Sequence, residues 1–148
     1  MTSRVTYLGE LRTECEHLQS GNKIITDAPV DNQGKGEAFS PTDTVATALA
    51  SCMLTVMGIK ARDMEVDMAG TTASVTKIMA ADPRRISEIE VVLAFPATYD
   101  EKTTSILERT ARTCPVTYGA SLAKNSTAQM IAMNIRMFFD GSTAFSSV

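Results

Sequence analysis

Three cysteines are the residues of this 148-residue sequence whose type could carry covalent chemistry: Cys15, Cys52 and Cys114. They lie far apart along the chain and match none of the spacings by which proteins hold zinc. An odd number of cysteines is typical of a protein that keeps its thiols reduced, so we expect a cytoplasmic location. There, a cysteine is either a small core residue or a redox-active thiol.

Cys52 is predicted to lie in the middle of a long helix, on a face whose other members are all apolar. That face consists of Val45, Ala48, Leu49, Val56 and Ile59. A cysteine in such a position is usually packed and inert, and the pattern alone favours this interpretation. Burial raises the pKa of a thiol, so a reactive Cys52 would need a nearby cation to stabilise its thiolate.

The other two cysteines have different surroundings. Cys114 is expected to end a second helix just before Pro115, where packing is again the simpler interpretation, although a helix end is better exposed. Cys15 lies two residues from His17 on a predicted strand, and this pair could be a nucleophile with its base or half of a metal site. His17 is the only histidine, so we favour structural roles for both and expect no metal site.

The elements that must position these residues predict an α+β fold. Residues 1–30 are expected to form a β-meander with a two-residue turn at Gly9-Glu10, followed by a polar, aperiodic loop over residues 27–38. A helix should begin in the segment Ser40-Pro41-Thr42-Asp43, because serine caps free N–H groups and proline fits the first helical position. This Ala-rich helix should run to about Arg62 and, being apolar all round, occupy the centre of the domain.

Strands and a second helix are expected in the rest of the chain. The strands are predicted at residues 69–79, 87–95 and 129–139, and the helix from Asp100 to the residue before Pro115. Residues 118–127 have no regular pattern. We expect one domain over residues 1–148, in which residues 141–148 form a flexible tail.

The composition argues against several classes of partner. Fourteen basic and seventeen acidic residues give a formal net charge of −3, whereas nonspecific nucleic-acid binding needs a basic surface. The longest uncharged stretch, residues 44–59, is too short for a hydrocarbon core of about 30 Å. The first residues lack the pattern of a secretory signal. We therefore expect a soluble protein without nucleic-acid or membrane partners.

Two segments together resemble the OsmC/Ohr family. Residues 39–53, Phe-Ser-Pro-Thr-Asp-Thr-Val-Ala-Thr-Ala-Leu-Ala-Ser-Cys-Met, are similar to the first cysteine helix of that family, and Cys114-Pro115-Val116 is similar to its second motif. The separation of 62 residues between the two cysteines and the order of the elements also match, so the resemblance covers nearly the whole chain. It implies the OsmC-like fold and an intertwined homodimer with sites at the subunit interface.

The resemblance also implies a function and a set of site residues. It implies a cofactor-free thiol peroxidase acting on organic hydroperoxides or hydrogen peroxide, in which Cys52 attacks the peroxide and Cys114 resolves the sulfenic acid to a disulfide. An arginine of the N-terminal strands would stabilise the thiolate, with Arg12 as the better match and Arg4 as the lesser candidate. An external dithiol, such as a lipoyl-bearing protein, would reduce the disulfide.

One position departs from the family pattern. The hydroperoxide-specialised branch carries a glutamate ten residues before the first cysteine, whereas this chain has Thr42 there. Asp43 lies about 180° around the helix from Cys52, so we expect it to cap the helix instead. The chain therefore resembles the broader OsmC-like branch, and a small-molecule-binding dimer or a redox sensor is the alternative to a peroxidase.

Overall fold

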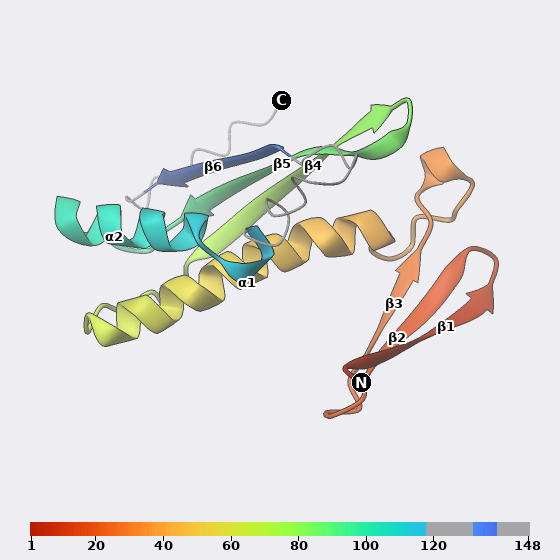
Figure 1. Ribbon diagram of the computed structural model, residues 1–148, viewed down its shortest axis with the longest axis horizontal. Helices are drawn as coiled ribbons and strands as arrows, with labels where there is room; N and C mark the ends of the chain where they lie inside the picture. The colour runs from red at the N-terminus through yellow and green to blue at the C-terminus, as the bar shows by residue number, and fades with distance from the viewer. Residues whose placement is uncertain (118–131, 139–148) are drawn as a thin grey trace. The chain divides into compact units, whose positions relative to one another are not determined.

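The computed structural model describes residues 1–117 and 132–138, which divide into two compact units at residues 45 and 46. Residues 1–45, here unit 1, form an antiparallel three-stranded sheet in the order β1-β2-β3, coloured red to orange in Figure 1. Its strands are β1 (Ser3–Gly9), β2 (Arg12–His17) and β3 (Lys23–Asp27). A short 3-10 helix, η1 (Val30–Asn32), lies in the loop that follows, so the predicted meander and loop are confirmed.

The first turn of unit 1 lies one residue later than predicted. Its two central residues are Glu10 and Leu11, with φ angles of 50° and 63°, instead of Gly9 and Glu10. Positive φ at both central residues is the geometry that matches the twist of a hairpin. Because the turn ends at Leu11, Arg12 is the first residue of β2 and lies opposite Asp27 of β3.

The long helix α1 (Pro41–Asp63) begins where the sequence predicted. The Ser40 hydroxyl oxygen accepts a hydrogen bond from the Asp43 backbone N–H at 3.1 Å, and the Asp43 carboxylate accepts one from the Ser40 backbone N–H at 2.9 Å. This reciprocal pair is a capping box, which satisfies two N–H groups that a helix start leaves free. Asp43 therefore has the capping role expected for it.

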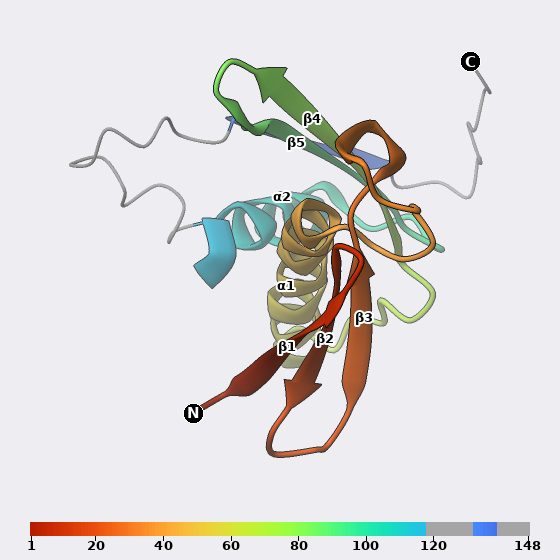
Figure 2. The ribbon, with the colours of Figure 1, turned by 90° about the vertical axis from the view of Figure 1, so that its right-hand side faces the viewer.

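Unit 2, residues 46–148, contains the second sheet and the rest of the helices. The sheet has the order β4-β5-β6, in which β4 and β5 are antiparallel and β6 is parallel to β5. Both α1 and α2 cover the same face of this sheet (Figures 1 and 2). The elements are β4 (Thr72–Ala81), β5 (Arg84–Ala94), α2 (Glu101–Arg112) and β6 (Ala132–Phe138). The α+β prediction is confirmed, while the expectations for residues 118–127 and 141–148 lie outside the described residues.

The core of unit 2 lies between α1, α2 and β5. One face of α1 buries Leu49, Met53 and Met57, and α2 buries Leu107 and Ala111. Between them pack the alternating apolar side chains of β5 and the residue after it: Ile89, Val91, Leu93 and Phe95. This alternation was predicted, because successive strand residues point to opposite faces of a sheet.

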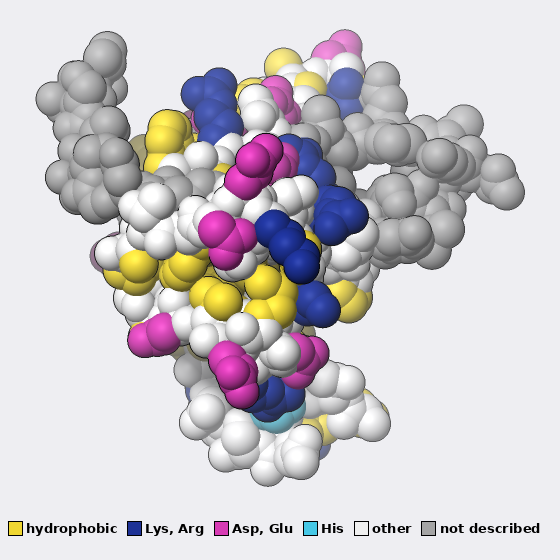
Figure 3. Space-filling view, turned by 90° about the vertical axis from the view of Figure 1, so that its left-hand side faces the viewer, with side chains coloured by type: hydrophobic (Ala, Val, Ile, Leu, Met, Phe, Trp, Pro, Cys, Tyr) yellow, Lys and Arg dark blue, Asp and Glu magenta, His cyan; other side chains and the backbone are white. Residues whose placement is uncertain are grey.

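The other face of α1 is not buried, which corrects the expectation of a helix enclosed on all sides. Val45 and Ile59 remain 47% and 50% exposed. Within the part of the chain that the structure describes, α1 is the one helix long and apolar enough to cross a membrane, a property that the core helices of globular domains share. Figure 3 shows a face of the molecule on which hydrophobic side chains lie among acidic and basic ones.

Replacing Leu93 by alanine should lower the free energy of unfolding by about 2–5 kcal/mol, because the fully buried side chain would leave a cavity. Val30→Ala is the matched control: Val30 is exposed, and its loss should change the stability by about 0.5 kcal/mol or less. Urea denaturation followed by circular dichroism measures both. Equal effects of the two substitutions would contradict the core described above.

Candidate functional site

Cys52 lies at the border between the buried and the exposed face of α1. Its side chain is half-buried and packs against the core, next to the fully buried Met53. Ala48, which precedes Cys52 by one turn of α1, is exposed. Cys52 is therefore not the fully enclosed core residue that its apolar helix face favoured, because its side chain is only partly buried.

Cys114 follows α2 and is completely buried. Its backbone N–H donates to the Ala111 carbonyl oxygen at 3.3 Å, so it continues the last turn of the helix. Pro115 then begins a new helical stretch, a position that suits a residue without an N–H. The Cys114 sulfur lies 3.0 Å from the Thr117 hydroxyl oxygen, which holds the thiol in one orientation.

The fold brings Cys52 and Cys114 together from elements 62 residues apart in sequence. The two thiols are within hydrogen-bonding contact, and the Val116 backbone N–H donates to the Cys52 sulfur. Burial is the largest influence and raises the pKa of Cys52, and a negative charge on Cys114 raises this pKa further, while the Val116 N–H lowers it. The net effect raises the pKa, so Cys52 holds its proton more tightly than a free cysteine does.

Two thiols in contact can be oxidised to a disulfide, provided that one of them first becomes a good nucleophile. No cation among the described residues contributes to the ionisation of Cys52. The raised pKa agrees with the argument from the sequence that a reactive Cys52 would need a nearby cation, and the described residues supply none.

Arg12, the arginine expected to supply that charge, lies in unit 1 and is held by two carboxylates. Its Nη2 lies 3.0 Å from the Asp27 Oδ2 atom and also contacts the Glu37 carboxylate. The neighbouring carboxylates of Glu14 and Glu10 pair instead with Lys23 and Lys35. Sequence analysis missed Asp27 and Glu37; the strand register, which places Asp27 opposite Arg12, is the signal that finds the first of them.

The remaining candidates are separate from the thiol pair. Arg4 forms an exposed ion pair with Glu16 at 3.9 Å. The His17 Nδ1 atom bonds to the Ser20 hydroxyl at 2.7 Å, and Cys15 lies 3.9 Å from the Thr13 hydroxyl. Within residues 1–117 and 132–138, no three His, Cys, Asp or Glu side chains are grouped as a metal site would require.

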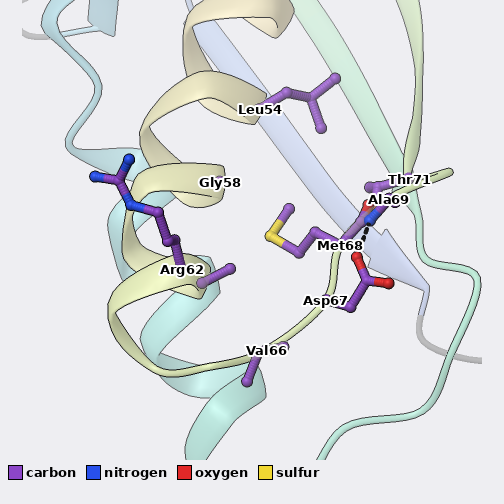
Figure 4. A pocket seen from close by; sticks show the side chains of 9 residues that line it. Leu54, Gly58, Arg62, Val66, Asp67, Met68, Ala69 and Thr71 are labelled. Carbon is purple, nitrogen blue, oxygen red and sulfur yellow. Dashed lines mark hydrogen bonds between the residues drawn. The ribbon is translucent and has the colours of Figure 1, made fainter.

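Two pockets lie beside α1, and neither includes Cys52 among its lining residues. The first, of about 470 Å³, lies between the second half of α1 and residues 66–71. Figure 4 shows the Met68 side chain pointing towards Gly58 of α1, whereas the Arg62 guanidinium points away from it. The second, of about 450 Å³, is lined by Thr47, Ala73 and neighbouring residues. The thiol pair of Cys52 and Cys114 is therefore separate from both pockets.

This combination of an α+β fold and two facing thiols defines a class of protein, and the comparisons identify it. The model of the OsmC-like protein family matches residues 34–130, about two thirds of the chain. Among proteins of curated function, none matches this sequence. The chain belongs to the OsmC/Ohr family.

Solved structures agree with this assignment. A crystal structure of a Psychrobacter arcticus protein, provisionally described as an osmotic stress induced and detoxification response protein, is 59% identical, with a TM-score of 0.85 over 93% of this chain and 96% of that one. An OsmC-like protein from Mycoplasma pneumoniae has 16% identity and a TM-score of 0.73 over 95% and 98%. An organic hydroperoxide resistance protein from Legionella pneumophila has 15% identity and a TM-score of 0.65 over 93% and 96%. The last two show the shared fold.

Oxidation of the reduced protein with diamide should join Cys52 to Cys114, because their thiols are already in contact. Intact-mass analysis should show the loss of two hydrogens per chain, and peptide mapping should assign the bond. Closing a loop of 62 residues should raise the free energy of unfolding by about 4 kcal/mol. Cys15→Ser is the control that should behave as the unaltered protein; a Cys15-containing disulfide as the main product would contradict the site.

Proposed function

We propose that this protein is a thiol peroxidase that reduces organic hydroperoxides. The observation that carries the proposal is the contact between Cys52 and Cys114, in which the first residue is half-buried and the second completely buried. Peroxide must reach the attacking sulfur, whereas the resolving sulfur needs only to reach its neighbour. This difference in burial supports Cys52 as the attacking thiol and Cys114 as the resolving thiol.

The reaction has three steps. The Cys52 thiolate attacks the outer oxygen of the hydroperoxide, the O–O bond breaks, and the alkoxide leaves and takes a proton to become an alcohol; the sulfur is oxidised to a sulfenic acid. The Cys114 thiol displaces water from this sulfenic acid and forms the disulfide. An external dithiol, for which a lipoyl-bearing protein is a suitable carrier, then reduces the disulfide in a reducing cytoplasm and is itself oxidised.

Arg12 has the charge that this chemistry needs. A guanidinium is protonated at every relevant pH, and the hydrogen bonds that Arg12 donates to Glu37 and Asp27 raise its pKa further. In the proposed mechanism it lowers the pKa of Cys52, which the surroundings in unit 2 raise. The apolar side chains of Val56 and Ile59, on the same face of α1 as Cys52, favour an organic hydroperoxide over hydrogen peroxide.

One equivalent of tert-butyl hydroperoxide should convert the reduced protein to the Cys52–Cys114 disulfide faster than hydrogen peroxide does. Cys114→Ser should stop at a sulfenic acid that dimedone traps on Cys52, because the resolving thiol is missing. Cys52→Ser should consume no peroxide, and Cys15→Ser, the matched control, should keep the full rate. Stopped-flow kinetics with intact-mass analysis gives all four results.

The alternative is a redox sensor or a small-molecule-binding dimer with unreactive thiols. The raised pKa of Cys52 favours this alternative unless a cation reaches the thiol. Thiols that remain reduced in excess peroxide would refute the peroxidase, and so would unchanged peroxide consumption in Cys52→Ser.

We also propose that two copies of the chain form a homodimer. Large apolar side chains remain exposed on both units, including Ile59 of α1 and Tyr7 of β1, which are 50% and 65% exposed. Exposed apolar patches of this kind mark interaction surfaces. A dimer would also enclose the open side of Cys52.

Ile59→Glu should weaken this dimer, because a charge would replace a buried side chain at the interface. Sedimentation equilibrium should give twice the chain mass for the unaltered protein and a shift towards the single-chain mass for the variant at the same concentration. Gln19→Glu, at an exposed polar position outside the exposed apolar side chains, is the control that should leave the dimer intact. A single-chain mass for the unaltered protein at micromolar concentration would refute the dimer.

A further inference from the structure

The buried thiol of Cys114 has a polar partner that the three reaction steps above do not use. Its sulfur lies 3.0 Å from the hydroxyl oxygen of Thr117, which is in the helical stretch that begins at Pro115. Cys114 is completely buried, whereas Thr117 is half-buried. The hydroxyl therefore connects a thiol that has no access to water with a side chain that solvent can reach in part.

The hydroxyl of Thr117 differs from those of other helical threonines in this chain. Thr55 of α1 and Thr110 of α2 each donate to the backbone carbonyl oxygen four residues earlier, at 2.8 Å. This bond is a common one for a threonine inside a helix. The residue four before Thr117 is Thr113, the C-cap of α2, so it belongs to the turn that ends that helix. Thr117 contacts the Cys114 sulfur instead.

The hydrogen bond between the two thiols has a direction. Burial has the largest effect on Cys52 and raises its pKa, the Val116 N–H lowers this pKa, and the side-chain hydrogen bond with Cys114 raises it. A hydrogen bond raises the pKa of an acid when the acid donates its own proton, because ionisation removes the bond. Cys52 is therefore the donor, and a lone pair of the Cys114 sulfur points towards it.

This direction leaves the Thr117 oxygen as the acceptor for the hydrogen of the Cys114 thiol. Within the described part of the chain, Cys52 and Thr117 are the side chains hydrogen-bonded to this sulfur. A thiol has one hydrogen, so a sulfur that accepts from Cys52 can donate its own hydrogen to the hydroxyl. The same orientation suits disulfide formation, in which a lone pair of Cys114 must meet the oxidised sulfur of Cys52.

We propose that Thr117 orients the Cys114 thiol and takes up its proton when the disulfide forms. The lone pair of Cys114 attacks the sulfenic sulfur of Cys52, the S–S bond forms, and the S–O bond breaks. Cys114 is oxidised and Cys52 is reduced to the level of a disulfide. The departing hydroxide becomes water with the hydrogen that Thr117 gives up as it receives the proton of Cys114, so the threonine ends unchanged. The proposal rests on the thiol chemistry proposed above.

The test separates disulfide formation from the attack on peroxide. Methyl methanethiosulfonate, a small reagent, places a methylthio group on Cys52 of the Cys15→Ser protein, and Cys114 then displaces methanethiol to form the disulfide. Intact-mass analysis of quenched samples follows this displacement. Thr117→Val removes the hydroxyl with little change of shape and should slow the displacement about tenfold, as expected for the loss of one hydrogen bond. Thr117→Ser retains a hydroxyl and should keep the rate within about twofold of the unaltered protein.

Thr110→Val is the matched control, because the same substitution removes a hydroxyl that donates to the Ile106 carbonyl oxygen instead of contacting a thiol. It should change the displacement rate by less than about twofold. Treated with tert-butyl hydroperoxide, Thr117→Val should form the Cys52 sulfenic acid at the unaltered rate. This acid should persist long enough for dimedone to trap it, because only its conversion to the disulfide is slowed.

The other outcomes separate this proposal from the peroxidase. A displacement rate in Thr117→Val equal to that of the unaltered protein would overturn the role of Thr117, and so would an equal loss in Thr117→Ser or in Thr110→Val. Slower formation of the sulfenic acid in Thr117→Val would overturn it too, because the hydroxyl would then act on the first thiol. A displacement that depends on Thr117, in a protein that consumes no peroxide, would support this role and refute the peroxidase.

A second measurement covers the case in which Thr117→Val does not fold. In the Cys15→Ala/Cys52→Ala protein, Cys114 is the one remaining thiol, and infrared spectroscopy can detect its S–H stretching band. A hydrogen bond donated to Thr117 should place this band below the frequency of a thiol that has no acceptor. A band at the frequency of a thiol without an acceptor would overturn the proposal.

Discussion

The ionisation of the Cys52 thiol is the constraint on which the proposed chemistry of this protein depends. A thiolate packed beside an apolar core loses most of its hydration, so burial raises the pKa of Cys52. A negative charge on the adjacent Cys114 raises the pKa of Cys52 further, and the hydrogen bond from the Val116 N–H offsets only part of this rise. The two thiols are therefore placed to form a disulfide, but the raised pKa makes the Cys52 thiolate scarcer than that of a free cysteine at the same pH.

Helix α1 both contributes a face to the core of unit 2 and carries Cys52 beside that face. One face carries Leu49, Met53 and Met57 into the core of unit 2, and that packing fixes the rotation of the helix. The rotation in turn places Cys52 at the edge of the buried face, close to Cys114 and still open on one side. A closely packed core, and not a loop, therefore positions the Cys52 thiol.

In unit 1, a positively charged side chain, Arg12, is held by a buried carboxylate. A cross-strand pair at the end of a hairpin gives Arg12 a partner at a fixed distance, and the chain around Phe39 closes over that partner. The neighbouring pairs of Lys23 with Glu14 and Lys35 with Glu10 are exposed and contribute little to stability. The arginine pair differs because one member is buried, so its geometry persists.

Local patterns in the sequence determined most of the fold. The cap at Ser40 and Asp43, the alternation of Ile89, Val91 and Leu93, and the helix start at Asp100 each depend on neighbours in the chain, so they could be predicted. A redox role for Cys52 and Cys114 could be predicted only from a family resemblance, because the pattern around each cysteine favoured a packed, inert thiol. The first turn was placed one residue early, because Gly9 has a positive φ but ends a strand instead of beginning the turn.

What the tertiary structure decided was which distant groups meet. Cys52 and Cys114 come into contact because the two helices pack against one face of a sheet, and no local pattern carries that information. Asp27 became the partner of Arg12 through the strand register, and its burial through a loop that returns to cover it. The residue type determines the charge and the hydrogen-bonding capacity of a side chain in water. Packing determines its burial and its neighbours, which change its pKa and its partners.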